Sequence, residues 1–233
     1  PFHHQGQWNA KIGKSRSKSV YLPHSFNDMA KAVVFDMGGV ILRLDIRRCI
    51  ETFKTVVGFQ DIDNYLDPFH QKGFIGDFEA GRIGVDEFYA ACIAHSRPGT
   101  TLEEVKYCFN SLLDGYNSDV VNLVKELYFM GCDLYILSNN NPLSVKALSE
   151  ELENLGVSLE TTFRKLFFSY QMKLLKPGRE IYERMIRETG REPSDIIFID
   201  DSKVNIAAGA AAGLATVLYS PDIDIRSTVM GML

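Results

Sequence analysis

Short apolar runs alternate with helical patterns over most of the chain. The runs 32–35 and 196–199 are apolar throughout, and 132–137 is apolar except for Asp133; none shows the polar alternation of a half-exposed strand, which is typical of strands covered on both faces. Shorter strands are predicted at 165–169 and 214–219, and helices lie between the strands at 118–130, 141–156, 178–190 and 202–213, with Ser118 as an N-cap. This order predicts an α/β fold, a doubly wound, Rossmann-like parallel sheet with right-handed crossovers and helices on both faces.

A long insert follows the first strand and contains no comparable apolar run. Its pattern is helical at 49–57 and again at 85–94, with Gly or Pro interrupting these segments. An insert of this length is too long for a simple connection. We therefore expect a lid or second small domain at 49–115, inserted into a core domain formed by 29–48 and 116–233.

The first 28 residues differ in character from the rest. They are rich in His, Ser, Lys and Gln, lack apolar periodicity, and contain four basic residues against Asp28 alone. The first methionine is Met29, just before the first predicted strand. We expect residues 1–28 to form a disordered or non-native tail, with a basic arm that binds a partner as the alternative.

Composition narrows the class of protein further. With 233 residues, 45% of them hydrophobic, the chain can bury one good core and a smaller second one. A net charge of −5 gives no indication of nucleic acid or an acidic membrane as a partner. No apolar run is long enough to span a bilayer, and the four cysteines are scattered without a C-x-x-C pair. These features favour a cytoplasmic protein with free thiols.

Polar residues follow each of the predicted buried strands. In an open parallel sheet, ligands bind beyond the carboxyl ends of the strands, so these residues are candidates for one site. They are Asp36, Ser138 with Asn139, Lys176 before Pro177, and Asp200, Asp201 and Ser202.

The predicted site combines several carboxylates with a hydroxyl and an amine. Carboxylates placed close together repel one another unless a cation lies among them. Oxygen ligands with few fixed groups suit Mg²⁺, which is bound by one or two carboxylates together with a substrate phosphate. Ser138 and Lys176 then supply a donor and a positive charge for that phosphate. The sequence therefore predicts phosphoryl transfer on a small phosphorylated metabolite, with Mg²⁺ as cofactor.

These motifs, in this order, resemble the haloacid dehalogenase superfamily. The resemblance rests on FDMGGVIL around Asp36, LSNNN around Ser138, Lys176-Pro177, and IDDSKVNIAAG around Asp200, so it spans 36–205. With FEAGRI in the insert, the local sequence is similar to a subgroup of sugar-phosphate phosphatases and to the amino-terminal phosphatase domain of soluble epoxide hydrolases. The resemblance implies that the insert is the superfamily's helical cap.

The resemblance also implies a role for each motif residue. Asp36 is expected to be the nucleophile that forms an aspartyl-phosphate, and Lys176 to neutralise the phosphate and orient Asp36. Mg²⁺ is expected to be bound by Asp36, the backbone carbonyl of Gly38 and Asp201, with Asp200 acting through water. Ser138 and the amide of Asn139 are expected to hold phosphate oxygens, and Asn205 and Ser202 to support the last loop.

Gly38 departs from the superfamily pattern. Most of its phosphatases carry a second Asp there, which protonates the leaving group, and a general acid/base contributes roughly 10²–10⁴ in rate. One explanation is a leaving group that needs little protonation, such as the anomeric oxygen of a sugar 1-phosphate. Another is a substitute acid, with Asp45 and Glu79 as candidates. A 2-haloacid dehalogenase and a non-catalytic metal- and phosphate-binding protein remain as alternatives.

Two further interpretations depend on order and position. A phospho-receiver domain also gathers Asp, hydroxyl and Lys residues, but its acid pair follows the first strand, whereas here the lone Asp36 comes first. Within the insert, Arg82 is the best candidate for contact with a polar substrate, followed by Glu79. Taken singly, each site residue has an ordinary structural explanation as a turn, a helix cap or a surface side chain.

Overall fold

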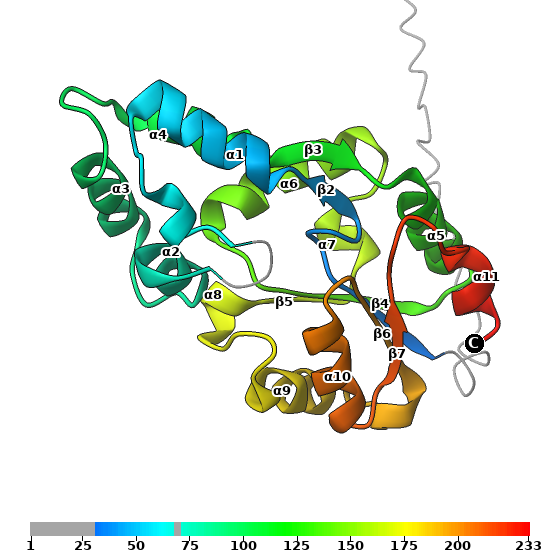
Figure 1. Ribbon diagram of the computed structural model, residues 1–233. Coiled ribbons are helices and arrows are strands. Elements are labelled where there is room, and N and C mark those ends of the chain that lie inside the picture. The colour runs from blue at the N-terminus through cyan, green and yellow to red at the C-terminus, as the bar shows by residue number, and fades with distance from the viewer. Residues whose placement is uncertain (1–30, 68–70) are drawn as a thin grey trace, which may run out of the picture.

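The computed structural model describes residues 31–67 and 71–233 (Figure 1). Its centre is a five-stranded sheet in the order β5-β4-β1-β6-β7, and every neighbouring pair of strands is parallel. The strands are β1 (Ala32–Phe35), β4 (Asp133–Ser138), β5 (Lys165–Phe168), β6 (Ile196–Asp200) and β7 (Ala215–Leu218). The predicted α/β fold is therefore confirmed. The expected tail at 1–28 lies outside the described residues.

Successive residues of β1 point to opposite faces of the sheet, as strand geometry requires. Val33 and Phe35 belong to the core on one face, and Ala32 and Val34 to the core on the other. All four residues are fully buried, since their relative exposure is 0%. Helices therefore cover both sides of the strand, which explains why its sequence is a continuous apolar run.

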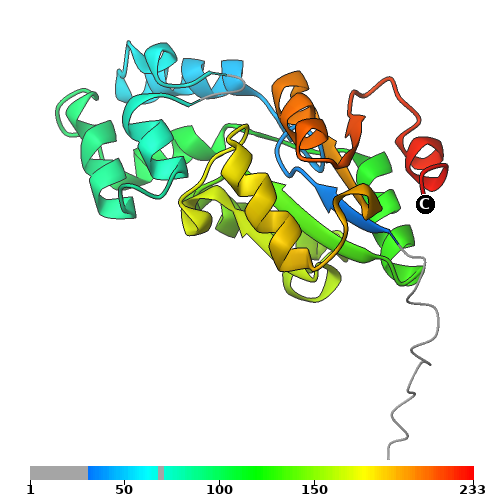
Figure 2. The ribbon, with the colours of Figure 1, turned by 90° about the horizontal axis from the view of Figure 1, so that it is seen from below.

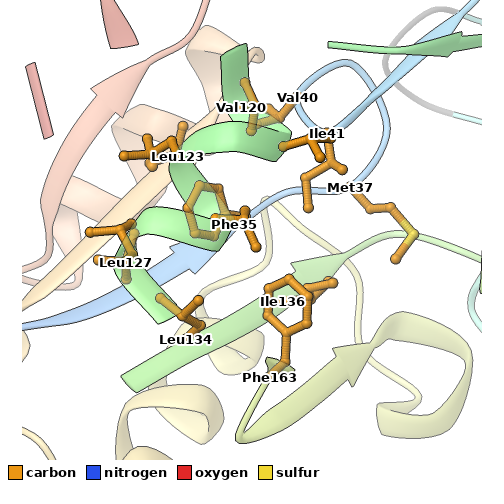
Figure 3. Packing of buried hydrophobic residues seen from close by; sticks show 14 of the residues in the cluster. Phe35, Met37, Val40, Ile41, Val120, Leu123, Leu127, Leu134, Ile136 and Phe163 are labelled. Carbon is orange, nitrogen blue, oxygen red and sulfur yellow. The ribbon is translucent and has the colours of Figure 1, made fainter. Parts of the chain in front are cut away.

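The first face of the sheet is covered by helices that follow β3 and β4, and by the last helix of the chain. Figure 3 shows Leu123 and Leu127 of one of these helices packed toward Phe35 and Leu134. Fully burying a side chain of this size contributes roughly 1.5–3 kcal/mol, so this layer is a main source of stability. The elements are α5 (Ser118–Phe129), α6 (Pro142–Asn154), α7 (Leu159–Thr162) and α11 (Ile225–Met230).

The second face is covered by α9 (Arg179–Thr189) and α10 (Lys203–Ala211) (Figure 2). Helix α9 buries Ile181, Tyr182 and Met185, which recur at helical spacing. Helix α10 lies very close to the sheet, because a Cβ atom at Gly209 would be 2.9 Å from Cδ1 of Phe198. This close approach explains the small residues of the Ala-rich segment.

The insert is helical, as its pattern predicts. It contains α1 (Ile46–Thr52), a π-helical turn (Phe53–Val57), a 3₁₀ turn (Ile62–Asn64), α2 (Gly73–Glu79), α3 (Val85–Ala94) and α4 (Leu102–Asn110). Among its described residues, fourteen that are buried, including Phe53, Phe78 and Phe88, form a core of its own. The exact division into domains stays a prediction.

Several elements differ from the sequence-based expectation. A short antiparallel pair, β2 (Leu42–Leu44) and β3 (Leu113–Tyr116), joins the insert to the sheet and was not predicted. Apart from the buried Leu42, its residues are partly or fully exposed, and they are too few to give a strand pattern. The predicted N-cap Ser118 is wrong, because Asn117 occupies that position and its amide donates to the carbonyl oxygen of Val40 at 2.6 Å. Short helices α8 (Ser169–Met172), α7 and α11 were also not predicted.

Candidate active site

The site residues come together because β1 lies between β4 and β6. Asp36 follows β1 directly, Ser138 is the last residue of β4, and Asp200 is the last residue of β6. The backbone amide of Asp36 donates to the carbonyl oxygen of Ile199 at 2.8 Å, which fixes the start of its loop to β6. The carboxyl ends of three neighbouring parallel strands therefore form one site. Strand β4 lies on one side of β1 and β6 on the other, which is the position where ligands bind in an open α/β sheet.

Three carboxyl groups meet at this edge. One oxygen each from Asp36, Asp200 and Asp201 lies within 4.8 Å of the others. Asp200 is fully buried, Asp36 is buried, and Asp201 is partly buried. Buried negative charges at this spacing need a compensating cation, and oxygen ligands are those that Mg²⁺ prefers. The arrangement therefore fits a divalent cation.

Lys176 is the one protein cation in contact with this cluster among the described residues. Its Nζ lies 2.9 Å from Oδ2 of Asp36 and 2.6 Å from Oδ2 of Asp200. Burial alone would lower the pKa of Lys176, but the two carboxylates outweigh burial and raise that pKa, so the ammonium group stays charged. A single positive charge does not balance three carboxylates.

The same environment raises the pKa of the acids above that of a carboxyl on the protein surface. Burial raises the pKa of Asp36 to about 7, with Asp200 and Asp201 adding to the shift and Lys176 opposing it. Burial and the charge of Asp200 also raise the pKa of Asp201. The metal-free cluster therefore holds protons that a bound cation displaces.

The loop after β6 is held by hydrogen bonds to Asp200. Its Oδ1 accepts from the backbone amide of Ser202 at 2.8 Å, and Nδ2 of Asn205 lies 3.1 Å from both carboxylate oxygens. Ser202 in turn caps α10, accepting from the amide of Asn205. These contacts place Ser202 and Asn205 behind the acid pair, where they fix the orientation of Asp200.

The side chain of Asn139 holds the lysine loop in place, a role that was not predicted. Its Nδ2 donates to the carbonyl oxygen of Lys176, and its Oδ1 accepts from the amide of Lys176, each at 2.9 Å. The backbone amide of Asn139, which is expected to bind phosphate, takes no part in these two hydrogen bonds. Ser138 lies beside it, 2% exposed, and both residues line the cavity at the site.

Gly39, rather than Gly38, is the glycine that the acid cluster requires. It has φ of +80°, and a Cβ atom there would be 2.1 Å from Oδ2 of Asp201. Only glycine allows both this backbone and this close approach. The sequence alone does not reveal the contact of Gly39 with Asp201, because the two residues lie far apart in the chain.

A cavity of about 290 Å³ lies between the acid cluster and the insert. Its sheet side carries Asp36, Ser138, Lys176 and Asp201, and its other side is mostly apolar, with Ile46, Leu66, Ile75 and Phe109 among its residues. Gln71 lines this side too, but both ends of its amide bond the backbone of Asp67. A small molecule can therefore bind with a polar group at the acids and the rest against the insert.

The candidates Glu79, Arg82 and Asp45 lie in different surroundings. Glu79 lines the cavity, and burial raises its pKa to about 8, with the charge of Asp36 adding to the shift and Lys176 opposing it. The expected substrate contact by Arg82 is not supported, because its guanidinium pairs with Asp77 at 2.6 Å and it does not line this cavity. Asp45 instead caps α1, accepting from the amide of Arg48 at 2.8 Å.

Taken together, an acid after the central strand, a buried lysine and an acid pair beneath a helical insert define a capped α/β hydrolase of the phosphoryl-transfer type. The chain belongs to the haloacid dehalogenase-like hydrolase family, whose model matches residues 30–213.

Three relatives make the comparison more specific. The chain is 35% identical over 210 residues to a D-ribitol-5-phosphate phosphatase of Bacteroides thetaiotaomicron, covering 88% of this chain and 99% of that protein. It is 25% identical over 186 residues to the sesquiterpene phosphatase astK of Aspergillus oryzae, covering 79% and 87%. A solved haloacid dehalogenase family enzyme of B. thetaiotaomicron, an aspartate-to-alanine mutant in complex with magnesium and inorganic phosphate, has a TM-score of 0.79 at 27% identity, covering 86% and 98%.

These comparisons confirm the predicted family, fold, phosphatase class and use of magnesium. They favour the phosphatase over the dehalogenase and the non-catalytic alternatives. Among residues 31–67 and 71–233, no helix combines the length and the apolar character needed to cross a membrane.

Proposed function

We propose that this protein is a Mg²⁺-dependent phosphatase that hydrolyses the phosphomonoester of a small sugar or polyol phosphate, with Asp36 as nucleophile. The observation that carries the proposal is the meeting of three carboxyl oxygens within 4.8 Å of one another, with Lys176 2.9 Å from Asp36. Such a site can hold a cation and a phosphate side by side, which is the main requirement of phosphoryl transfer.

The residues expected to hold the cation are Asp36, Asp201 and the carbonyl of Gly38, with Asp200 acting through water. When bound, the cation neutralises negative charge on the phosphate and draws electron density from the reacting phosphorus. Lys176 contributes a second, fixed positive charge at the same place. Because these charges are set before the substrate arrives, they stabilise the transition state without reorganisation.

The chain's own groups divide the hydrolysis into two displacements. An oxygen of Asp36 attacks phosphorus, and the alcohol leaves with a proton. Ser138 and the amide of Asn139 donate to the phosphate oxygens and hold the group in line. Water then attacks the aspartyl-phosphate, releasing inorganic phosphate and restoring the carboxylate of Asp36.

The proposed substrate class rests on the cavity and on one relative. A volume of about 290 Å³ suits a small metabolite. Among the described residues, no Lys or Arg lines the insert's side of the cavity, so a second phosphate has no partner there. The D-ribitol-5-phosphate phosphatase, at 35% identity, supports a polyol or sugar phosphate.

A prenyl phosphate is the second candidate. The insert's side of the cavity carries mainly apolar side chains, which suit a hydrocarbon group. The sesquiterpene phosphatase, at 25% identity, supports this alternative.

We further propose that residues 49–115 act as the cap domain that selects the substrate. We also propose that the protein works in the cytoplasm, which its free cysteines support.

A substrate panel tests the proposal. Phosphate release is measured from D-ribitol 5-phosphate, sugar phosphates and farnesyl phosphate, with Mg²⁺ and with a chelator. We expect release from polyol or sugar phosphates that needs Mg²⁺ and is lost in Asp36→Asn. Asp222→Asn is the matched control, because Asp222 is an exposed acid that does not line the cavity, and we expect this variant to keep full activity. Release that persists in Asp36→Asn, or chloride release from 2-chloropropionate without metal, would contradict the assignment.

A further inference from the structure

Two residues after the nucleophile Asp36, the chain has no side chain that can transfer a proton. Gly38 has no side chain, and the space where a Cβ atom would lie is occupied by Cδ1 of Leu44 at 2.8 Å. The alcohol of a polyol phosphate is a poor leaving group unless its oxygen is protonated. The proton therefore has to come from another part of the cavity.

Glu79 is placed to supply it. It is the last residue of α2 and lines the cavity together with Asp36 and Lys176. Glu79 is partly buried, and its carboxyl forms no hydrogen bond or ion pair with any residue in the described ranges. A carboxyl without a protein partner, facing the cavity, is available to a ligand.

The backbone of Glu79 is fixed to the core of the molecule. The hydroxyl of Ser169 donates to the carbonyl oxygen of Glu79 at 2.6 Å. The same hydroxyl accepts from the backbone amide of Asn140 at 2.9 Å, two residues after Ser138. The end of α2 is thus tied to the loop that is expected to bind phosphate, so Glu79 keeps its place relative to the nucleophile.

Two other polar candidates are engaged elsewhere. Gln71 of the insert bonds the backbone of Asp67, and Asp45, which precedes the insert, caps α1. Among the described residues, Glu79 is thus the one carboxyl that the insert brings to the cavity.

We propose that Glu79 is the general acid that protonates the leaving oxygen, and then the general base that activates water. The inference rests on the proposed phosphatase function and deepens it, because it assigns a catalytic residue in place of the missing side chain at Gly38.

The two steps balance in atoms and protons. In the first, Asp36 forms a bond to phosphorus, the bond from phosphorus to the alcohol oxygen breaks, and that oxygen takes the proton of Glu79. In the second, the carboxylate of Glu79 accepts a proton from water as the water oxygen bonds phosphorus, and the bond to Asp36 breaks. The alcohol, inorganic phosphate and the starting protonation state result.

The environment of Glu79 agrees with this assignment. Burial raises the pKa of Glu79 to about 8, with Asp36 adding to the shift and Lys176 opposing it. A carboxyl in this range holds its proton near neutral pH, whereas an ordinary glutamate does not. It can therefore donate the proton and, once ionised, accept another.

The test uses two phosphomonoesters, D-ribitol 5-phosphate and p-nitrophenyl phosphate, whose leaving groups differ in their need for a proton. The alcohol of D-ribitol 5-phosphate must be protonated as it leaves, whereas p-nitrophenolate leaves readily as an anion. The rate of the first turnover is measured by rapid mixing for the wild-type protein, Glu79→Gln and Glu103→Gln, each loaded with Mg²⁺. Glu103 is the matched control, a cap carboxyl that is 78% exposed and lies outside the cavity.

We expect Glu79→Gln to slow the first turnover of D-ribitol 5-phosphate by roughly 10²–10⁴-fold. Release of p-nitrophenolate in the first turnover should stay within about threefold of the wild-type rate, followed by slow later turnovers because water is no longer activated. That first turnover also demonstrates that the variant is folded and binds phosphate. Glu103→Gln should match the wild type on both substrates.

Equal slowing of both first turnovers would overturn the assignment, since it would indicate a structural or binding role for Glu79. Unchanged turnover of D-ribitol 5-phosphate would overturn it as well. A wild-type protein that is inactive on both esters would overturn the proposed function itself, and the inference with it. The two failures are therefore distinguishable.

Discussion

At the scale of single residues, the two glycines after the nucleophile have different reasons to be glycine. The positive φ of Gly39 and its closeness to Asp201 leave no room for a side chain. Gly38 has an ordinary φ, and a Cβ atom there would meet only the end of the flexible Leu44 side chain. There is therefore room for a side chain at Gly38 once Leu44 moves, but not at Gly39.

This difference leads to a paired prediction. Gly39→Ala should weaken Mg²⁺ binding by at least about tenfold, because the new methyl group displaces the carboxylate of Asp201 and strains the backbone. Gly38→Ala should change Mg²⁺ affinity by less than about threefold, because Leu44 can rotate away. Calorimetric titration with Mg²⁺ measures both. Equal losses in the two variants would contradict the structural argument.

The sequence could predict Asp36, Ser138, Lys176, Asp200 and Asp201 because each follows a strand or a motif that is visible locally. It could not predict the contact of Gly39 with Asp201 or the role of the Asn139 side chain. These contacts join segments that are far apart in the chain, and their geometry depends on how the strands align. Arg82 was predicted to touch substrate, but its guanidinium pairs with Asp77, five residues earlier, and it does not line the cavity.

At the scale of elements, the strongest predictions concern strands buried on both faces. The runs of β1, β4 and β6 are apolar enough to be recognised without knowledge of their neighbours. Their parallel arrangement follows from the helices between them. Elements of three or four residues, such as β2 and α8, carry no periodic pattern, so only tertiary contacts define them.

Helix α8 has a role in spite of its length, because Ser169 joins the end of α2 to the loop after β4. Ser169→Ala removes the partner of both the Glu79 carbonyl and the Asn140 amide. We expect a loss of about 1–3 kcal/mol in the free energy of unfolding, together with reduced kcat, because α2 no longer holds its position. Denaturant unfolding and steady-state kinetics measure the two effects.

Ser96→Ala is the control for this prediction. Ser96 also makes a short hydrogen bond to a backbone carbonyl, at 2.7 Å to Cys92, but it follows the C-terminal end of α3 and does not line the cavity. We expect it to lower stability slightly and to leave kcat unchanged. A loss of kcat in Ser96→Ala as large as in Ser169→Ala would contradict a specific link through Ser169.

At the scale of the whole molecule, the described residues form three hydrophobic clusters, one on each face of the sheet and one in the insert. The acids line the cavity between the sheet and the insert, and their charges are not balanced by the protein alone. The stability of the folded protein therefore depends on how the acid cluster is neutralised, either by protons or by a cation.

The pH dependence of stability follows from this competition. The folded pKa of Asp36 is about 7 against an ordinary value of 3.8, and that of Glu79 is about 8 against 4.5. Between about pH 4 and 8 the metal-free folded state holds protons that the unfolded state releases, so these groups lower the free energy of unfolding as pH rises. Mg²⁺ displaces the proton of Asp36, its expected ligand, so it should raise Tm more at about pH 7.5 than at about pH 5.5.

Thermal unfolding with and without Mg²⁺ at the two pH values measures this effect, of the order of a few kcal/mol at most. Asp36→Asn is the control, because it removes one charge and its titration. The difference between the two pH values should be smaller in that variant. An increase in Tm that is the same at both pH values would contradict the competition between protons and cation.

The most direct test of the account is to find the residue that carries the phosphoryl group during turnover. Protein mixed with substrate and Mg²⁺ is quenched in acid within the first turnovers, digested, and examined by mass spectrometry. The account predicts a phosphoryl group on the peptide that contains Asp36, absent without Mg²⁺ and absent in Asp36→Asn. Turnover with no phosphoryl group on the protein, or with one on a different residue, would contradict it.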